Sequence, residues 1–107
     1  MKDLMGLMKQ AQAMQQKMTE AQARLDETEV TGEAGAGLVS VLMTAKGELR
    51  KVSIDKSLLD PEEPEIVEDL VLAAHADARR KADAAQQEIM KDAAGGLDLP
   101  PGMKMPF

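Results

Sequence analysis

The first 27 residues carry an apolar seam that predicts a long amphipathic helix. Apolar residues recur there at spacings of four and three, and at ~100° per residue they fall within an arc of about 100°. The pattern predicts a helix over residues 3 to about 27 that packs along one face, as in a coiled coil. At ~1.5 Å of rise per residue this helix is roughly 35 Å long, so part of it should protrude from a small domain. The apolar seam consists of Leu4, Leu7, Ala11, Met14, Met18, Ala21 and Leu25.

The middle of the chain has a two-residue period that predicts a small sheet. Residues 29–33, 38–44 and 49–55 are rich in β-branched residues that alternate, and turn residues separate them, which is typical of short strands. Gly47 indicates a tight turn, so the last two segments form a hairpin. A three-stranded antiparallel meander is therefore predicted.

A second long helix is predicted from residue 66 to about 91. Its apolar positions recur at spacings of three and four and are mostly alanine, so another backbone is expected to approach closely. Pro64 suits a first helical position, and the acidic residues of 60–69 lie where the helix dipole favours negative charge. We expect a single α+β domain over residues 1–94 and a Gly-, Pro- and Met-containing tail over 95–107.

The order of helix, three strands and helix predicts an α+β protomer, α-β-β-β-α, with a three-stranded antiparallel sheet and two long helices. One such sheet is too small to cover both helices over their full length. A symmetric second copy is the commonest remedy. The prediction is therefore an intertwined homodimer with projecting helices.

The composition narrows the chemistry further. The absence of cysteine excludes disulfides, thiolate metal sites and a cysteine nucleophile. His75 is the single histidine and has no Ser or Cys partner suggested by spacing, so we expect no enzyme, no catalytic residues, no cofactor, no metal and no small-molecule substrate. The lack of a ~20-residue apolar run and the polar N-terminus argue against a membrane span and a signal peptide, so a cytoplasmic location is expected.

Two motifs resemble ligand sites but have simpler interpretations. In "GEAGAGL", Gly32, Gly35 and Gly37 follow the order G-x-x-G-x-G before a strand, whereas a dinucleotide fingerprint reads G-x-G-x-x-G before a helix. We interpret these glycines as turn residues that supply positive φ. The acids of 60–69 lack the spacing of a calcium loop, so we interpret them as a helix start.

The charge is distributed unevenly. The net charge of −6 disfavours nucleic acid as a bulk property, but residues 59–70 contribute six acids and no base. The first 24 residues contain four bases, and their only acids are Asp3 and Glu20. The four bases project within about 80° of one another, roughly opposite the seam, which favours phosphate contact over an ordinary solvated face. This basic stripe consists of Lys2, Lys9, Lys17 and Arg24.

A second group of bases, Arg79, Arg80 and Lys81, lies in the second predicted helix. Because the three are consecutive, they fan around the helix instead of lining one face. Asp77 and Asp83 flank them. Two interpretations of this group are therefore kept: ordinary surface charge and contact with DNA.

Five ordered segments together resemble the YbaB/EbfC family of bacterial nucleoid-associated proteins. They are "LMKQAQAMQQKM" (7–18), "EVTGEAGAGLVSV" (29–41), "VSIDKSLLD" (52–60), "VEDLVLAAHADARRKA" (67–82) and "LPPGMKMPF" (99–107). The resemblance implies a cytoplasmic, nucleoid-linked homodimer whose helices project like tweezers and bind double-stranded DNA with little sequence preference. It implies DNA contact by Lys9, Lys17, Arg79 and Arg80. From the residues themselves we add Arg24, which belongs to the basic stripe, and Lys81, which follows Arg80.

The predicted function is thus non-enzymatic binding of duplex DNA phosphates by a homodimer, which affects nucleoid organisation and gene expression. The alternative is a protein-interaction adaptor that grips a protein partner with its exposed helices. Met5, Met8 and the methionines of the tail would supply an adaptable apolar surface for that role. Replication or recombination proteins are further candidate partners.

Overall fold

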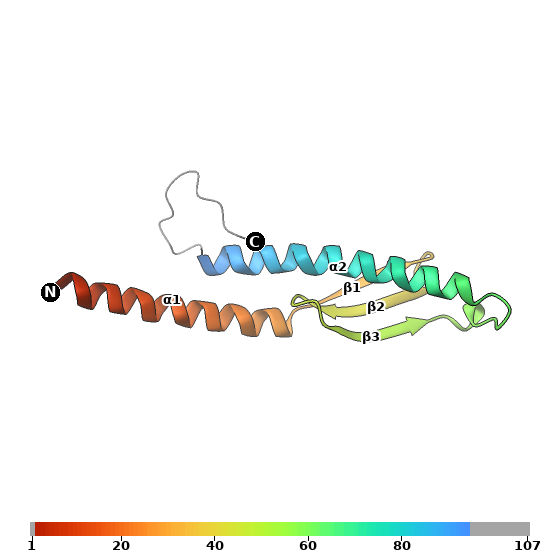
Figure 1. Ribbon diagram of the computed structural model, residues 1–107, viewed down its shortest axis with the longest axis horizontal. Coiled ribbons are helices and arrows are strands. Elements are labelled where there is room, and N and C mark those ends of the chain that lie inside the picture. The colour runs from red at the N-terminus through yellow and green to blue at the C-terminus, as the bar shows by residue number, and fades with distance from the viewer. Residues whose placement is uncertain (1, 95–107) are drawn as a thin grey trace.

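The computed structural model describes residues 2–94, and it confirms the predicted α+β fold (Figure 1). Every predicted strand agrees with the structure to within one residue at each end. A short 3-10 helix, η1, was not predicted, and the predicted tail 95–107 lies outside the described residues. The elements are α1 (Lys2–Glu27), β1 (Glu29–Ala34), β2 (Val39–Thr44), β3 (Leu49–Ile54), η1 (Lys56–Leu58) and α2 (Pro64–Ala94).

The sheet is antiparallel with strand order β1-β2-β3. Val39, Val41 and Met43 alternate along β2 toward one face and are fully buried. The register places Val52 of β3 beside Val41, on this same apolar face. The opposite face carries mainly polar residues, so α2 covers only the apolar face.

Small side chains let α2 lie very close to the sheet. Ala74, Ala78 and Ala82 of α2 are buried against the β2 residues. Gly32 of β1 lies beneath them, and a Cβ added there would overlap the backbone oxygen of Ala74 and the backbone nitrogen of Ala78. The predicted close backbone approach is confirmed. The interpretation of Gly32 as a turn residue was wrong, because it lies inside β1 and is needed for packing.

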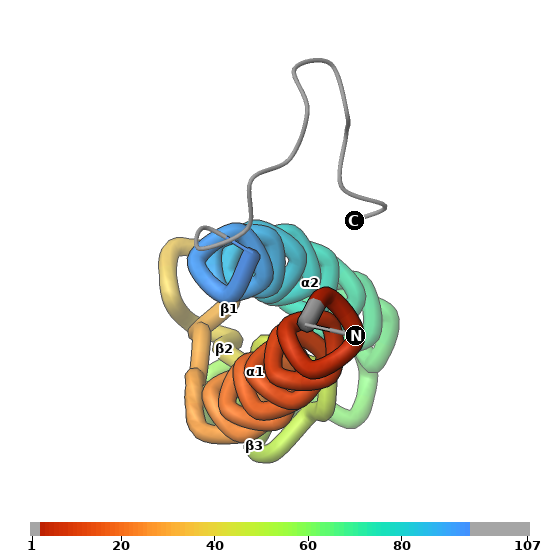
Figure 2. Tube along the Cα trace, turned by 90° about the vertical axis from the view of Figure 1, so that its left-hand side faces the viewer, coloured from red at the N-terminus to blue at the C-terminus, as the bar shows by residue number. Residues whose placement is uncertain are grey.

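The second half of α2 extends past the sheet and packs against the end of α1 (Figures 1 and 2). Leu25 of α1 is 2% exposed, and Ile89 and Met90 of α2 are each 4% exposed. The two helices run in opposite directions here, with α1 entering the sheet and α2 leaving it. The C-terminal part of the apolar seam is therefore covered within one chain.

The first half of α1 projects from the rest of the molecule, as predicted (Figure 1). Every residue from 3 to 16 is exposed. We call residues 3–16 the arm. Leu4 and Leu7 of the seam are each 60% exposed on the arm, and Met14 is 39% exposed. The seam thus packs from Met18 onward and is uncovered before it.

Candidate nucleic-acid interface

The predicted DNA-binding residues fall into three separate places. Lys9 stands on the arm, Lys17 and Arg24 lie where α1 meets α2, and residues 79–81 lie on α2 over the sheet. The structure therefore does not gather the candidates into one patch within a single chain. Each place has its own electrostatic environment.

Lys9 and Lys17 are the candidates that form no ion pair among residues 2–94. Lys9 is exposed on the arm and Lys17 is partly buried. Among residues 2–94, neither lysine lies within ion-pair distance of an acidic side chain. Lys9 has no carboxylate close by on the exposed arm, whereas Lys17 lines the same groove as Glu20 and Asp92 without forming an ion pair with either. Lysines outside ion pairs can release counterions when they bind DNA phosphates.

Arg24 differs, because an acid on the other helix pairs with it. Nη2 of Arg24 lies 3.5 Å from Oδ2 of Asp92, and both side chains are about half exposed. Lys17, Glu20, Arg24 and Asp92 line a shallow groove of about 180 Å³ between the helices. Glu20 therefore shares a face with the basic stripe. At Arg24 the basic stripe therefore meets an acid of α2.

The three candidate cations of α2, Arg79, Arg80 and Lys81, are each paired with an aspartate. Arg79 Nε lies 3.6 Å from Asp83 Oδ1, and Arg80 Nη2 lies 3.3 Å from Asp77 Oδ1. Lys81 Nζ lies 3.2 Å from Asp77 Oδ2. These pairs follow the helical spacings of three and four residues, so the sequence already contained the signal for them.

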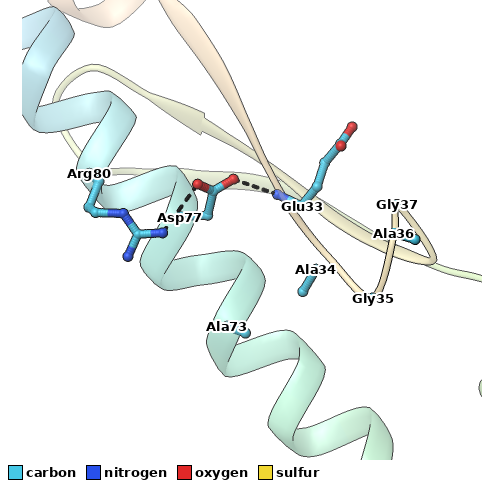
Figure 3. A pocket seen from close by; sticks show the side chains of 8 residues that line it. All are labelled: Glu33, Ala34, Gly35, Ala36, Gly37, Ala73, Asp77 and Arg80. Atoms are coloured by element: carbon cyan, nitrogen blue, oxygen red, sulfur yellow. Dashed lines mark hydrogen bonds and ion pairs between the residues drawn. The ribbon is translucent and has the colours of Figure 1, made fainter.

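Asp77 is the most highly connected side chain of this group. Its Oδ2 accepts a hydrogen bond from the backbone N–H of Glu33 at 3.0 Å, and its Oδ1 pairs with Arg80 (Figure 3). Asp77 also pairs with Lys81. The Glu33 hydrogen bond, followed by that from Lys81, lowers the pKa of Asp77 below its ordinary value of 3.8. Asp77 is therefore held as a carboxylate that joins α2 to β1.

The glycine loop is a turn beside a shallow cavity (Figure 3). Gly35, Ala36 and Gly37 have φ values of 61°, 56° and 88°, which confirms the interpretation of Gly35 and Gly37 as turn residues. The cavity of about 510 Å³ is lined by the loop, Ala73, Asp77 and Arg80. The loop joins two strands and is not followed by a helix N-terminus, so it lacks the phosphate-binding geometry of a nucleotide loop.

The acidic stretch forms the start of α2, as interpreted. Pro64 is the first residue of α2, and Asp60 Oδ1 accepts a hydrogen bond from the N–H of Glu62 at 2.9 Å. Across residues 2–94, the structure contains no cluster of three or more His, Asp or Glu side chains placed to hold a metal ion. In the same range, no helix combines the length and apolar character that a membrane span needs.

Comparison with known proteins identifies the class. A model of the YbaB/EbfC DNA-binding family matches residues 1–97. A nucleoid-associated protein of Maricaulis maris is 79% identical over 107 residues and covers 100% of both chains. A nucleoid-associated protein of Caulobacter vibrioides is 58% identical over 97 residues, covering 91% of this chain and 89% of the relative.

A solved structure shares the fold. The crystal structure of an uncharacterized protein, HP0035, from Helicobacter pylori matches with a TM-score of 0.67 and 26% sequence identity. The match covers 83% of this chain and 90% of that chain. The chain therefore belongs to the YbaB/EbfC DNA-binding family. It is a nucleoid-associated DNA-binding protein and not an enzyme.

Proposed function

We propose that the chain acts as a homodimer that contacts the phosphates of duplex DNA through basic residues on its helices, with little sequence preference. It acts in the nucleoid, in the cytoplasm, and by covering DNA it alters nucleoid organisation and gene expression. The observation that carries this proposal is the position of Lys9 and Lys17, which have no carboxylate partner among the described residues.

The geometry of α1 favours phosphate contact over base readout. The basic side chains of α1 stand along one helix, and within residues 2–94 neither α1 nor α2 is part of a helix-turn-helix unit. Phosphate contacts position a protein on DNA without reading its sequence. Binding is therefore expected to be similar on unrelated duplexes and to weaken steeply as salt is added.

The case for a homodimer comes from apolar surface that one chain leaves uncovered. Leu4 and Leu7 on the arm are each 60% exposed, and Leu49 and Val52 of β3 are 48% and 42% exposed. Val52 lies on the apolar sheet face but beyond the cover of α2, which packs over β1 and β2. A second copy that covers these side chains gains the free energy of apolar burial, about 25 cal/mol per Å².

Binding of purified protein to several unrelated duplexes at two salt concentrations tests the proposal. Fluorescence anisotropy is expected to give similar affinities for all duplexes and a large loss of affinity at the higher salt. Sedimentation velocity of the free protein is expected to give the mass of a dimer. Affinity that differs strongly between duplexes and resists salt would contradict phosphate contact.

The arm also favours a second candidate, the protein-interaction adaptor. Met5 and Met8 are 67% and 58% exposed, which is unusual for large apolar side chains on a solvated helix. Flexible methionines suit binding of an apolar protein surface. A pull-down that survives nuclease treatment and is lost in a Met5→Ser, Met8→Ser variant, with negligible DNA binding at physiological salt, would favour this function.

A further inference from the structure

The three consecutive cations of α2 have different neighbours on the sheet. Arg79 reaches the turn between β2 and β3, where a Cβ added to Gly47 would overlap NH1 of Arg79. This guanidinium is therefore packed against the turn as well as paired with Asp83. Its position depends on the hairpin, and a bound phosphate would have to draw it away from that contact.

Lys81 is held on the opposite side, at the open edge of β1. Its Nζ donates a hydrogen bond to the backbone C=O of Thr31 at 2.8 Å. The neighbouring Asp77 accepts from the N–H of Glu33, two residues further along β1. β1 is an edge strand, so no strand within residues 2–94 pairs with the C=O of Thr31 or the N–H of Glu33. The two α2 side chains supply the hydrogen bonds to these groups instead.

Arg80 lies between these two residues in the sequence, but within residues 2–94 the only hydrogen bond of its side chain is with Asp77 and not with the sheet backbone. Its side chain is 72% exposed, compared with 54% for Arg79 and 50% for Lys81. Its ion pair is with Asp77, one turn earlier on the same helix (Figure 3). Exposed pairs of this kind are weak, so a DNA phosphate can replace the carboxylate.

We infer that Lys81, with Asp77, is a positioning residue that fixes α2 on the open edge of β1, so that Arg80 is the α2 cation that contacts phosphate. This assignment rests on the proposed function for the role of Arg80. The clamp formed by Lys81 and Asp77 is independent of DNA. Of the three adjacent cations, Arg79 and Lys81 therefore hold α2 on the sheet, and Arg80 faces the DNA phosphate.

Single substitutions of the three residues by Gln test this division, with two measurements on each protein. Salt-dependent DNA binding counts phosphate contacts, because each lost contact reduces the slope of log affinity against log salt by ~0.9. Thermal unfolding reports the clamp. Lys91→Gln is the matched control, since Lys91 is an exposed α2 lysine that makes no ion pair within residues 2–94.

Arg80→Gln is expected to reduce the slope by ~0.9 per chain and to weaken binding about fivefold per chain at 0.15 M salt, with little change in Tm. Lys81→Gln is expected to lower Tm by about 5 °C while its slope matches that of Lys91→Gln. Arg79→Gln is expected to resemble Lys81→Gln. A Lys81→Gln protein with unchanged Tm, or with a slope reduced as much as in Arg80→Gln, overturns the inference.

Hydrogen exchange at the Glu33 amide keeps the clamp testable if Lys81→Gln folds poorly. The amide is expected to exchange slowly in the wild-type protein and at least tenfold faster in Asp77→Ala. Equal exchange rates in the wild-type protein and in Asp77→Ala would overturn the inference that Asp77 and Lys81 hold α2 on β1. A Lys9→Gln, Lys17→Gln variant measured alongside separates the two ideas: if its slope is also unchanged, the proposed function has failed, whereas the Tm and exchange results still decide the clamp.

Discussion

Replacing Asp92 by Asn should strengthen DNA binding. Asp92 is the α2 carboxylate that lies 3.5 Å from Arg24, and both side chains are about half exposed. In the free protein this carboxylate occupies the place that a DNA phosphate would take beside Arg24. Asn has nearly the same size but carries no charge, so Arg24 becomes available while the packing of the groove stays the same.

The size of the effect can be worked out in two ways. An exposed ion pair contributes up to about 1 kcal/mol, which corresponds to a factor of about five in affinity if binding must break it. Independently, one additional phosphate contact steepens the salt slope by ~0.9. If affinities converge near 1 M salt, this slope gives about a fivefold gain at 0.15 M. The two estimates agree on about fivefold per chain.

Fluorescence anisotropy over a salt series measures both quantities. Asp83→Asn is the matched control, because it removes the same charge from α2 but releases Arg79, which is packed against the Gly47 turn. Asp92→Asn is expected to bind more tightly than Asp83→Asn and to have the steeper slope. Equal behaviour of the two variants would show that only net charge matters and would refute a role for Arg24 at the groove.

Three further predictions concern stability and assembly. Gly32→Ala should destabilise the protein by about 1–3 kcal/mol or more, because its Cβ meets the α2 backbone, and thermal unfolding should show a lower Tm. Because the pKa of Asp77 is lowered in the folded state, its contribution to stability is present above about pH 3.8 and is lost as the pH falls through the folded pKa. Between pH 6 and pH 2.5 the free energy of unfolding of the wild-type protein should therefore fall by this contribution, whereas Asp77→Asn has no carboxylate there and should not show this loss. Equal acid sensitivity of the two proteins would argue against the role of Asp77. Val52→Lys should shift sedimentation velocity toward the monomer, since Val52 is apolar and 42% exposed, and an unaffected dimer would place the interface elsewhere.

The helices and strands were predictable because the spacing of apolar residues that marks each of them lies within a short stretch of sequence. The seam gave the helical period of α1, and the alternation of Val39, Val41 and Met43 gave the strand period of β2. The alanine face of α2 also indicated a close backbone approach. The predicted strand over residues 29–33 already contained Gly32, but its packing role was not predictable, because the α2 residues above it, Ala74 and Ala78, lie far away in the sequence.

The candidate site was less predictable, because its electrostatics depend on distant residues. Asp92 pairs with Arg24 across 68 positions of sequence, and no local pattern reveals such a partner. By contrast, Asp77 precedes Lys81 by four residues, so that pair was visible as a helical spacing. The pattern of the seam showed that one face of α1 is apolar, but not that its cover within one chain begins only at Met18.

We propose that lysines on α1 that form no ion pair attract DNA electrostatically, although the chain as a whole is acidic. The most direct test compares the salt dependence of DNA binding for the wild-type protein and a Lys9→Gln, Lys17→Gln variant on the same duplex. For a dimer that uses both lysines of each chain, the slope of log affinity against log salt should fall by about 3.6. An unchanged slope would contradict the account.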